Sequence, residues 1–236
     1  MMTELTLPII GYMHSSYKEK FGIPRQPNLV QVESYIEMSA PYNDVLAFEG
    51  IEAFSHLWLV WQFHDNKNPE KTQFRPQVRP PRLGGNKKIG VFATRSMYRP
   101  SQIGLSVVRL KCVKKEGKSV RVYVTGSDLL DGTPIVDIKP YIHYSDAVIN
   151  AESGYAQDEP KRKSVIWSDR AIEQKQQLLM SEKLSVQTAQ ELEAVLSLDP
   201  RPAYQDDEAR VYKMKFAAVD IAFTVGETTV NITAVE

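Results

Sequence analysis

The sequence predicts a mainly β protein with a smaller α+β subdomain at its C-terminal end, on three observations. Short apolar segments separated by glycine, proline or lysine turns fill the first two-thirds of the chain. Two helical patterns follow, and a pair of alternating apolar segments ends the chain. Short strands between turns are typical of a β-barrel or a β-sandwich, and the helical pattern that begins near residue 165 indicates a second unit.

The expected strands of the first part are rich in Val, Ile, Leu and aromatic residues. The two strands on either side of Gly117 are expected to form a hairpin. Two polar loops, 64–88 and 144–163, interrupt the strands, and loops of that length in a compact domain are usually functional or mobile. The strands are predicted over residues 5–13, 30–37, 54–63, 89–94, 104–113, 119–125 and 135–138.

The C-terminal third has a different pattern. Ser168 is a suitable N-cap for a helix that runs to about Glu182, and Ser185 is one for a helix that runs to about Leu196. Alternating apolar residues on both sides of Gly226 predict a terminal hairpin over 219–225 and 230–235. We therefore expect three parts: a β domain over residues 1–145, a loop or linker over 146–164, and an α+β subdomain over 165–236.

The composition is that of an ordinary globular protein, with 42% apolar and 25% charged residues among 236. No apolar run approaches the roughly 18 residues that span a bilayer, and the N-terminal residues make a poor signal peptide. Cys112 is the single cysteine, so an internal disulfide is excluded and a reducing cytoplasm is the expected location. The four histidines lack the paired spacing of a zinc or iron site, so no metal is expected.

Zero net charge conceals an uneven distribution of charge along the chain. The sequence holds 29 basic and 29 acidic residues, yet the window from Lys71 to Lys115 contains 12 basic residues and no acidic one. So one-sided a window favours a positively charged face, and polyanions are the usual partners of such a face. The alternative is that the window passes through several strands, which would scatter its charges over the surface.

Several common enzyme classes leave no motif in this sequence. It has no G-x-S-x-G nucleophile motif, no P-loop, and no G-x-G-x-x-G turn after a strand. A Rossmann-type cofactor domain would also show alternating strands and helices, which the first part lacks. Any cofactor is therefore expected to bind on a β scaffold.

Polar segments at expected strand ends and in loops have a plain structural interpretation when they are taken singly, because a sequence such as DGTP (131–134) suits a turn before a strand. Together, and in this order, they resemble the TrmO (YaeB, TsaA-like) family. The resemblance covers nearly the whole chain. Its segments are SYKEKF (16–21), PRQP (24–27), EAFSHLW (52–58), RPPRLGGN (79–86), GVFATRS (90–96), DGTP (131–134) with KPY (139–141), and DPRPAY (199–204).

This resemblance implies a TsaA-like β-barrel and a homodimer that uses S-adenosylmethionine to methylate tRNA. The implied reaction is N6-methylation of N6-threonylcarbamoyladenosine (t6A) at position 37, next to the anticodon, which gives m6t6A. The chain departs from the family at Ser101-Gln102, where Asn-Pro is common, so the loop loses a ring constraint. The cofactor positions carried over by the resemblance are Pro24, Arg25, Gln26, His64, Asp65, Arg95, Leu105, Asp131, Gly132, Thr133 and Pro134.

Chemistry suggests roles for some of these positions. Asp65 or Asp131 can hold the ribose hydroxyls or the ammonium group of the cofactor, and Arg25 or Arg95 can pair with its carboxylate. Backbone groups of Gly132 and Thr133 can hydrogen-bond the adenine edge, because little side chain stands in the way.

The acceptor nitrogen of t6A is a weak nucleophile that must lose its proton, so a base can assist. Asp137, His64 and Tyr98 are the candidates, and the sequence does not choose among them. The phosphates of the tRNA anticodon stem-loop are expected on Arg75, Arg79, Arg82, Lys87 and Lys88.

Two other functions stay open. A non-enzymatic regulatory module that binds S-adenosylmethionine or RNA predicts cofactor binding without methyl transfer. A hydrolase acting on a small phosphorylated ligand also fits a basic loop, although the missing nucleophile and metal motifs disfavour it.

Overall fold

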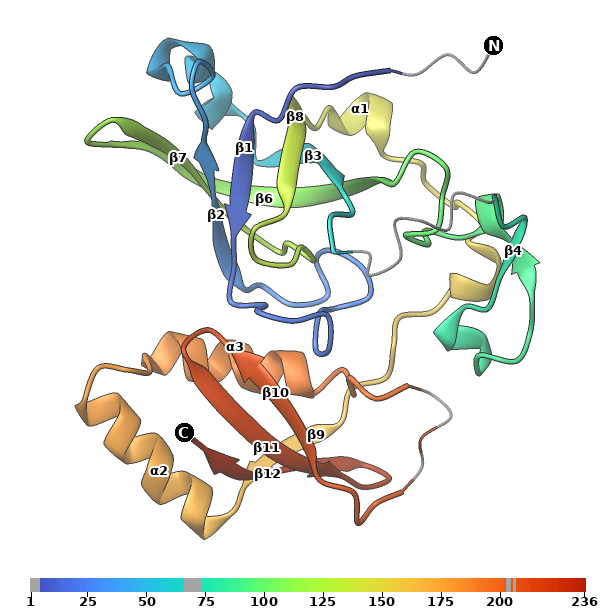
Figure 1. Cartoon of the computed structure of the whole chain (residues 1–236), viewed down its shortest axis with the longest axis vertical. Helices are drawn as coiled ribbons and strands as arrows, with labels where there is room; N and C mark the ends of the chain where they lie inside the picture. Colours follow the sequence, from blue (N-terminus) through green and yellow to red (C-terminus); the bar gives the residue numbers. More distant parts are fainter. Residues whose placement is uncertain (1–4, 66–73, 203–204, 206) are drawn as a thin grey trace.

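A β-barrel and a smaller α+β unit make up the computed structural model, which describes residues 5–65, 74–202, 205 and 207–236. The α+β unit lies below one end of the barrel (Figure 1). The barrel is closed in the order β1-β2-β7-β6-β3-β8. Its strands are β1 (Gly11–His14), β2 (Glu33–Met38), β3 (His56–Gln62), β6 (Ile103–Glu116), β7 (Ser119–Thr125) and β8 (Pro134–Pro140).

Side-chain alternation explains why these segments close into a barrel. In β7, Val120, Val122 and Val124 are fully buried, and the residues between them are only partly buried. Leu57 and Leu59 of β3 point into the same core. The period of two is the pattern of a strand with one face on a core, and antiparallel β6 and β7 form the expected hairpin, with Gly117 at φ +63° in its turn.

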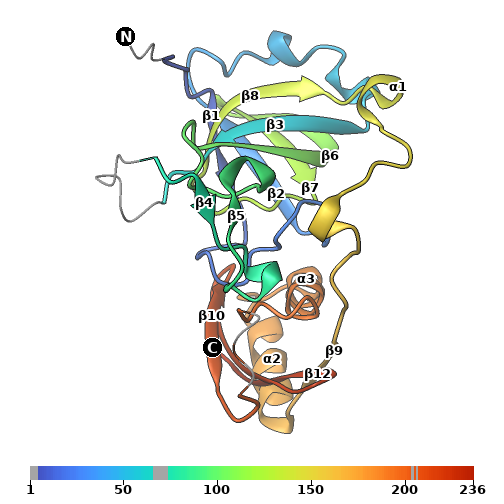
Figure 2. The same cartoon turned by 90° about the vertical axis from the view of Figure 1, so that its right-hand side faces the viewer.

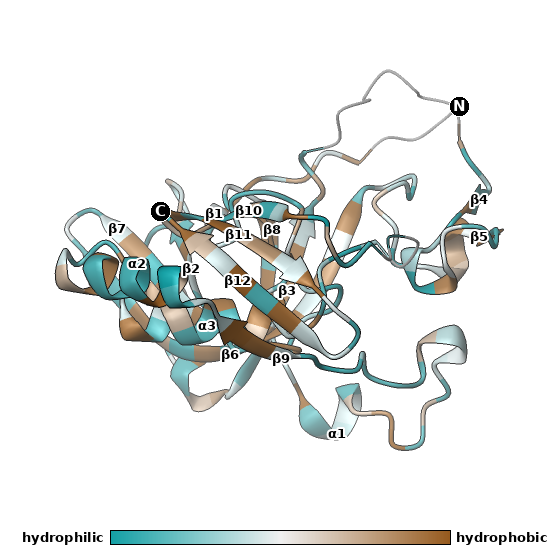
Figure 3. Ribbon diagram, turned by 90° about the horizontal axis from the view of Figure 1, so that it is seen from below, coloured by the Kyte–Doolittle hydropathy of each residue, from teal (hydrophilic) through white to brown (hydrophobic). Residues whose placement is uncertain are grey.

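The C-terminal unit is a four-stranded sheet in the order β10-β11-β12-β9, packed against two helices. The caps predicted at Ser168 and Ser185 are confirmed, because their hydroxyls accept hydrogen bonds from the amides of Ala171 and Thr188. Apolar and polar residues alternate along β12, as Figure 3 shows. The elements are β9 (Ser164–Trp167), α2 (Asp169–Met180), α3 (Val186–Leu196), β10 (Tyr212–Phe216), β11 (Val219–Val225) and β12 (Thr229–Val235).

Residues 15–32, which we call the junction segment, pack against the C-terminal unit and hold it to the barrel. This segment connects two barrel strands, yet Tyr17, Val30 and Val32 belong to the hydrophobic core of the C-terminal unit. The amide of Ala217 donates to the carbonyl of Ser16 at 2.8 Å, and the rings of Tyr17 and Phe216 lie 5.9 Å apart. Burial of this segment fixes the loop that carries PRQP (24–27) between the two units.

Some predicted elements are wrong in extent. The strand expected over 89–94 is only β5 (Ile89–Gly90), because its partner β4 (Gln77–Val78) is equally short, and a 3-10 turn (Val91–Ala93) follows. The strand expected from residue 5 begins at Gly11, where pairing with β2 begins. The strands β4, β9 and β10 were not predicted from the sequence. The remaining helix is the short α1 (His143–Asp146), and further 3-10 turns lie at Val45–Phe48, Ile51–Ala53, Pro81–Leu83 and Gly154–Ala156.

Within the described ranges, no helix has the length and apolarity needed to cross a membrane.

Candidate active site

A cavity of about 650 Å³ lies at the end of the barrel that faces the C-terminal unit. Its walls come from the junction segment, the end of β3 and the residues after it, the start of β6, and the loop before β8. We call residues 74–99 the β4–β5 segment (Figure 2). Its last residues, from Phe92 to Arg99, form the fifth wall. This volume is in the range of pockets that enclose a cofactor-sized molecule.

Aromatic rings form the floor of the cavity. The rings of Trp61 and Phe63 meet edge to face, with centroids 4.4 Å apart. Gly104 of β6 makes this packing possible, because a Cβ at Gly104 would lie 2.3 Å from the Trp61 ring. An apolar floor of this kind can bury the flat face of a nucleoside.

We expect Gly104→Ala to push the Trp61 ring into the cavity. Overpacking of this kind costs about 1–3 kcal/mol of stability, and the displaced ring should also weaken ligand binding. Thermal unfolding and calorimetry measure the two effects. Gly90→Ala is the matched control, since a Cβ at Gly90 meets nothing within 4 Å. Equal melting temperatures and affinities for the two variants would contradict this account of Gly104.

A buried hydrogen-bond chain leads from the floor to a carboxylate. The indole N–H of Trp61 donates to Ser106 Oγ at 3.0 Å, and this hydroxyl donates to Asp128 Oδ1 at 2.6 Å. Ser106 is 1% exposed. Burial raises the pKa of Asp128 to about 6, although the Ser106 hydrogen bond and the charge of Arg95 act in the opposite direction. Asp128 is therefore more basic than an exposed aspartate.

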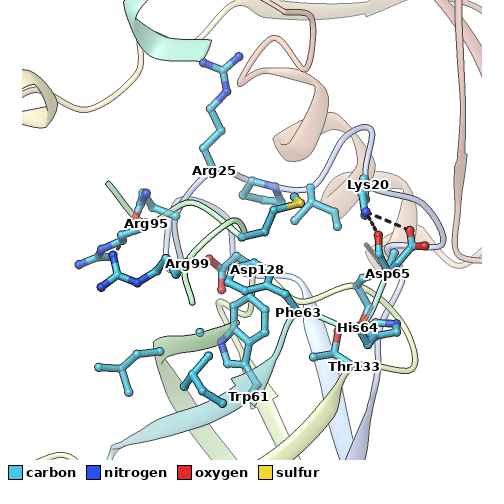
Figure 4. Close-up of a pocket in the computed structure, with 18 of the residues that line it drawn as sticks. Lys20, Arg25, Trp61, Phe63, His64, Asp65, Arg95, Arg99, Asp128 and Thr133 are labelled. Atoms are coloured by element: carbon cyan, nitrogen blue, oxygen red, sulfur yellow. Dashed lines mark hydrogen bonds and ion pairs between the residues drawn. The ribbon is translucent and has the colours of Figure 1, made fainter. Parts of the chain in front are cut away.

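Charged groups stand on the two sides of Asp128 (Figure 4). On one side, the ammonium of Lys20 lies 3.4 Å from an Asp65 carboxylate oxygen. On the other side, Arg95 donates to Gln26 Oε1 at 2.5 Å, and Arg99 donates to the carbonyl of Thr94 at 2.7 Å. The cavity can therefore hold a ligand that carries both charged and aromatic groups.

Most of the expected cofactor positions line this cavity, but the Asp131–Pro134 turn mostly does not. Arg25 lines the wall, yet its guanidinium extends away from the floor and donates to the carbonyl of Arg201 at 3.0 Å (Figure 4). The expected residues in the lining are Pro24, Arg25, Gln26, His64, Asp65, Arg95, Leu105 and Thr133.

Asp131, Gly132 and Pro134 lie outside the lining because the fold itself uses them. The Asp131 carboxylate accepts from the amide of Ser15 at 2.9 Å and lies 2.8 Å from the ammonium of Lys18. The amide of Gly132 donates to the carbonyl of Met13, and Pro134 pairs with β1 as the first residue of β8. This turn fastens the loop before β8 to the barrel.

The amides of Gly132 and Thr133, whose backbone was considered for an adenine edge, already have partners in this structure. Both donate within the protein, to Met13 and Leu130 respectively. Thr133 Oγ1 likewise donates to the carbonyl of Leu130.

Sequence reasoning missed several lining residues. Asp128 carried a usable signal, since Gly126-Ser127-Asp128 is a polar cluster directly after the β7 strand. Trp61 and Phe63 carried none, because aromatic residues in a strand pattern are typical of any core. The missed residues are Lys20, Ile23, Trp58, Trp61, Phe63, Phe92, Thr94, Met97, Arg99, Ile103, Gly104, Asp128 and Leu130.

The acid-free window divides into two surfaces. Its first half forms the β4–β5 segment beside the cavity, where the five cations expected to bind RNA are all exposed: Arg75, Arg79, Arg82, Lys87 and Lys88. Its second half follows β6 away from the cavity, where Lys111 pairs with Glu33 and Lys114 lies over the Tyr123 ring. The window is therefore not one continuous basic face, and Lys71 lies outside the described residues.

Among the residues that the structure describes, no cluster of three or more His, Cys, Asp or Glu side chains is arranged to hold a metal ion.

Two family models match the chain and together span most of it. Residues 12–147 match the model described as "tRNA-methyltransferase O N-terminal domain". Residues 160–236 match the model described as "TrmO C-terminal domain".

Relatives and solved structures agree with these matches. The chain is 44% identical over 208 residues to a tRNA (adenine(37)-N6)-methyltransferase of Escherichia coli K12, covering 88% of this chain and 86% of the relative. It is 38% identical over 189 residues to a mouse protein of the same name, covering 79% of this chain and 41% of the relative. The crystal structure of TrmO from Pseudomonas aeruginosa superposes with a TM-score of 0.79 at 34% identity, covering 100% of this chain and 99% of that one.

Proposed function

The chain belongs to the TrmO family of S-adenosylmethionine-dependent tRNA (adenine-N6)-methyltransferases, and from this premise we propose that its substrate is t6A at position 37 of tRNA. The product is then m6t6A. The threonylcarbamoyl group is taken from the family resemblance, and the observation that supports tRNA as the substrate is the position of the cavity: its aromatic floor and ionic groups lie beside the exposed cations of the β4–β5 segment. Cofactor and polyanion can therefore meet at one edge of the barrel.

The cavity residues fit S-adenosylmethionine by their chemistry. The aromatic floor of Trp61 and Phe63 suits the adenine ring. Arg95 suits the cofactor carboxylate, and Asp65 suits the ribose hydroxyls or the ammonium group. Gln26, hydrogen-bonded to Arg95, holds that guanidinium in place.

Methyl transfer from a sulfonium is an in-line displacement in which the positive charge on sulfur disappears. The main contributions of the protein are therefore to position the two reactants and to supply a fitted electrostatic environment. The cavity walls come from segments far apart in sequence, so the packing of the barrel against the junction segment sets this geometry.

Exposed cations of the β4–β5 segment are proposed to hold the phosphates of the anticodon stem-loop. We expect Arg79→Ala and Lys87→Ala each to weaken tRNA binding and to lower the salt dependence of log K by about one unit. Binding titrations at several salt concentrations measure this. Lys213→Ala is the control, since Lys213 is an exposed cation of β10 on the C-terminal unit. Wild-type affinity and slope in the first two variants would remove the β4–β5 segment from the RNA surface.

The modified base is tested with labelled methyl transfer to tRNA that carries or lacks the threonylcarbamoyl group. The proposal predicts incorporation into the modified tRNA alone. Equal incorporation into both tRNAs would show that unmodified adenosine suffices and would contradict t6A as the substrate.

A homodimer in the cytoplasm is also part of the proposal, and it is supported by the family resemblance. Sedimentation equilibrium should give twice the mass of one chain, and a monomer at assay concentration would refute it. The alternative of a non-enzymatic regulatory module has less support, because the curated relatives named above are named as enzymes.

A further inference from the structure

N6-methylation of adenine releases a proton, and the protein must offer it a destination. As the methyl group moves, a bond forms between N6 and the methyl carbon, and the bond between that carbon and sulfur breaks, leaving its electron pair on sulfur. The N6–H proton is then acidic and must be accepted by a base or by water. A positioned carboxylate typically accelerates such a transfer by about 10²–10⁴-fold.

Two of the three bases considered from the sequence do not face the cavity. Asp137 is half-exposed on β8 and lies 2.8 Å from the ammonium of Lys139. Tyr98 is 56% exposed, and neither residue lines the cavity. His64 does line it. Among the described lining residues, the carboxylates are Asp65 and Asp128, and Asp65 is already paired with Lys20.

Hydrogen bonding gives Asp128 a defined orientation. An indole N–H can only donate, so Ser106 Oγ must accept from Trp61 and direct its own proton at Asp128. Asp128 Oδ1 is thereby held as an acceptor by residues of two barrel strands. Among the described residues, no other side chain donates to this carboxylate.

We propose that Asp128 is a catalytic residue that accepts the N6 proton of the target adenine during methyl transfer. The proton passes from N6 to a carboxylate oxygen of Asp128 and then to solvent through the open cavity. This role rests on the adenine-N6 activity of the family and does not depend on the threonylcarbamoyl group.

The electrostatic setting suits this task at neutral pH. Burial raises the pKa of Asp128 to about 6, so the group is mostly ionised at pH 7 while remaining a stronger base than an exposed aspartate. The charged group that acts on it is Arg95 of the β4–β5 segment. Burial and the charge of Asp128 raise the pKa of Tyr17 in the junction segment, so this phenol is neutral at pH 7 and places no charge beside Asp128. The positive charge of Arg95 lowers the pKa of Asp128 and so favours its ionised form.

The first test is Asp128→Asn, which keeps the size of the side chain and an oxygen acceptor for Ser106. We expect the single-turnover rate to fall by about a hundredfold or more. Affinity for S-adenosylmethionine by calorimetry and affinity for tRNA should both stay near wild type. Asp220→Asn removes a carboxylate from the exposed face of β11 and should keep the full rate.

The second test is the pH profile, which a purely structural role would not move. The wild-type rate should rise with pH through a limb near pH 6 and then level off. Ser106→Ala removes a hydrogen bond that lowers the Asp128 pKa, so its limb should move to higher pH. Asp128→Glu should recover part of the rate that Asp128→Asn loses.

Two results would overturn the proposal. One is a wild-type rate for Asp128→Asn. The other is a loss of S-adenosylmethionine affinity in Asp128→Asn that is as large as the loss of rate in the same variant, which would make Asp128 a ligand of the cofactor ammonium instead. If Asp128→Asn fails to fold, an unchanged pH limb in Ser106→Ala refutes the assignment by itself. A tRNA that the wild type methylates is used throughout, so these outcomes are independent of which adenosine is the target.

Discussion

Replacing Arg95 with alanine is expected to weaken S-adenosylmethionine binding by about 10- to 100-fold. Arg95 lines the cavity beside Asp128 and is held by Gln26 at 2.5 Å. A charge-assisted hydrogen bond to a carboxylate is worth about 1.5–3 kcal/mol, which sets the expected change in affinity. Calorimetric titration of the protein with the cofactor measures it directly.

Two further variants make the Arg95 experiment specific. Arg75→Ala removes an exposed cation of the same β4–β5 segment that does not line the cavity, and it should leave cofactor affinity unchanged. Arg25→Ala should have a smaller effect than Arg95→Ala, because the Arg25 guanidinium turns toward the carbonyl of Arg201. Normal cofactor affinity in Arg95→Ala would remove the carboxylate-binding role from this residue.

Asp199→Ala is expected to destabilise the C-terminal unit by about 3 kcal/mol. The Asp199 carboxylate accepts a bidentate pair of hydrogen bonds from Arg201: Nε donates to Oδ1 and Nη2 donates to Oδ2, each at 2.9 Å. Arg201 is only 7% exposed, so loss of its partner leaves a buried charge unpaired, which is costly. For a chain of this size the melting temperature should fall by roughly 6–12 °C.

The backbone at Asp199 needs its own control, because φ there is +50°. Alanine tolerates this conformation less well than aspartate or glycine does. Asp199→Gly relieves the backbone while still removing the carboxylate, so it should be nearly as unstable as Asp199→Ala. If Asp199→Gly is as stable as wild type, the backbone and not the ion pair accounts for the effect.

The same ion pair makes stability depend on pH. Burial pushes the pKa of Asp199 upward, but the hydrogen bonds and charge of Arg201 outweigh it, so the pKa lies below its ordinary value. A depressed folded-state pKa adds stability above the unfolded value of about 3.9, and this stability is lost as pH falls through the folded pKa. The stability gap between wild type and Asp199→Asn should therefore close in acid.

Local patterns were sufficient to predict most of the fold. The short apolar segment after Gly117 predicted β7 with the bounds that the structure has, and the serine caps predicted the starts of α2 and α3. The sequence did not reveal β9, because its pairing is a parallel contact with β12 more than 60 residues away. Register with a distant strand is decided by packing, and no local pattern records it.

The site was harder to predict than the fold, for a similar reason. Polar segments at strand ends stand out against apolar strands, and the resemblance of these segments to the TrmO family is what assigned Arg95 and Asp65. The Asp131–Pro134 turn stands out equally, yet the Gly132 amide hydrogen-bonds β1 and the Asp131 carboxylate hydrogen-bonds Ser15 just after it, so both fasten the loop to the barrel. Asp128 follows β7 in a polar cluster, but the contacts that mark it out lie on other strands: it accepts from Ser106, which in turn accepts from Trp61.

We propose that this barrel transfers a methyl group to N6 of t6A at position 37. The most direct measurement is nucleoside mass spectrometry of tRNA after reaction with cofactor labelled on its methyl carbon. The account predicts that the labelled methyl appears on the t6A nucleoside, converting it to m6t6A, and that position 37 is the site. Label on unmodified adenosine, on another position, or on no nucleoside at all would contradict it.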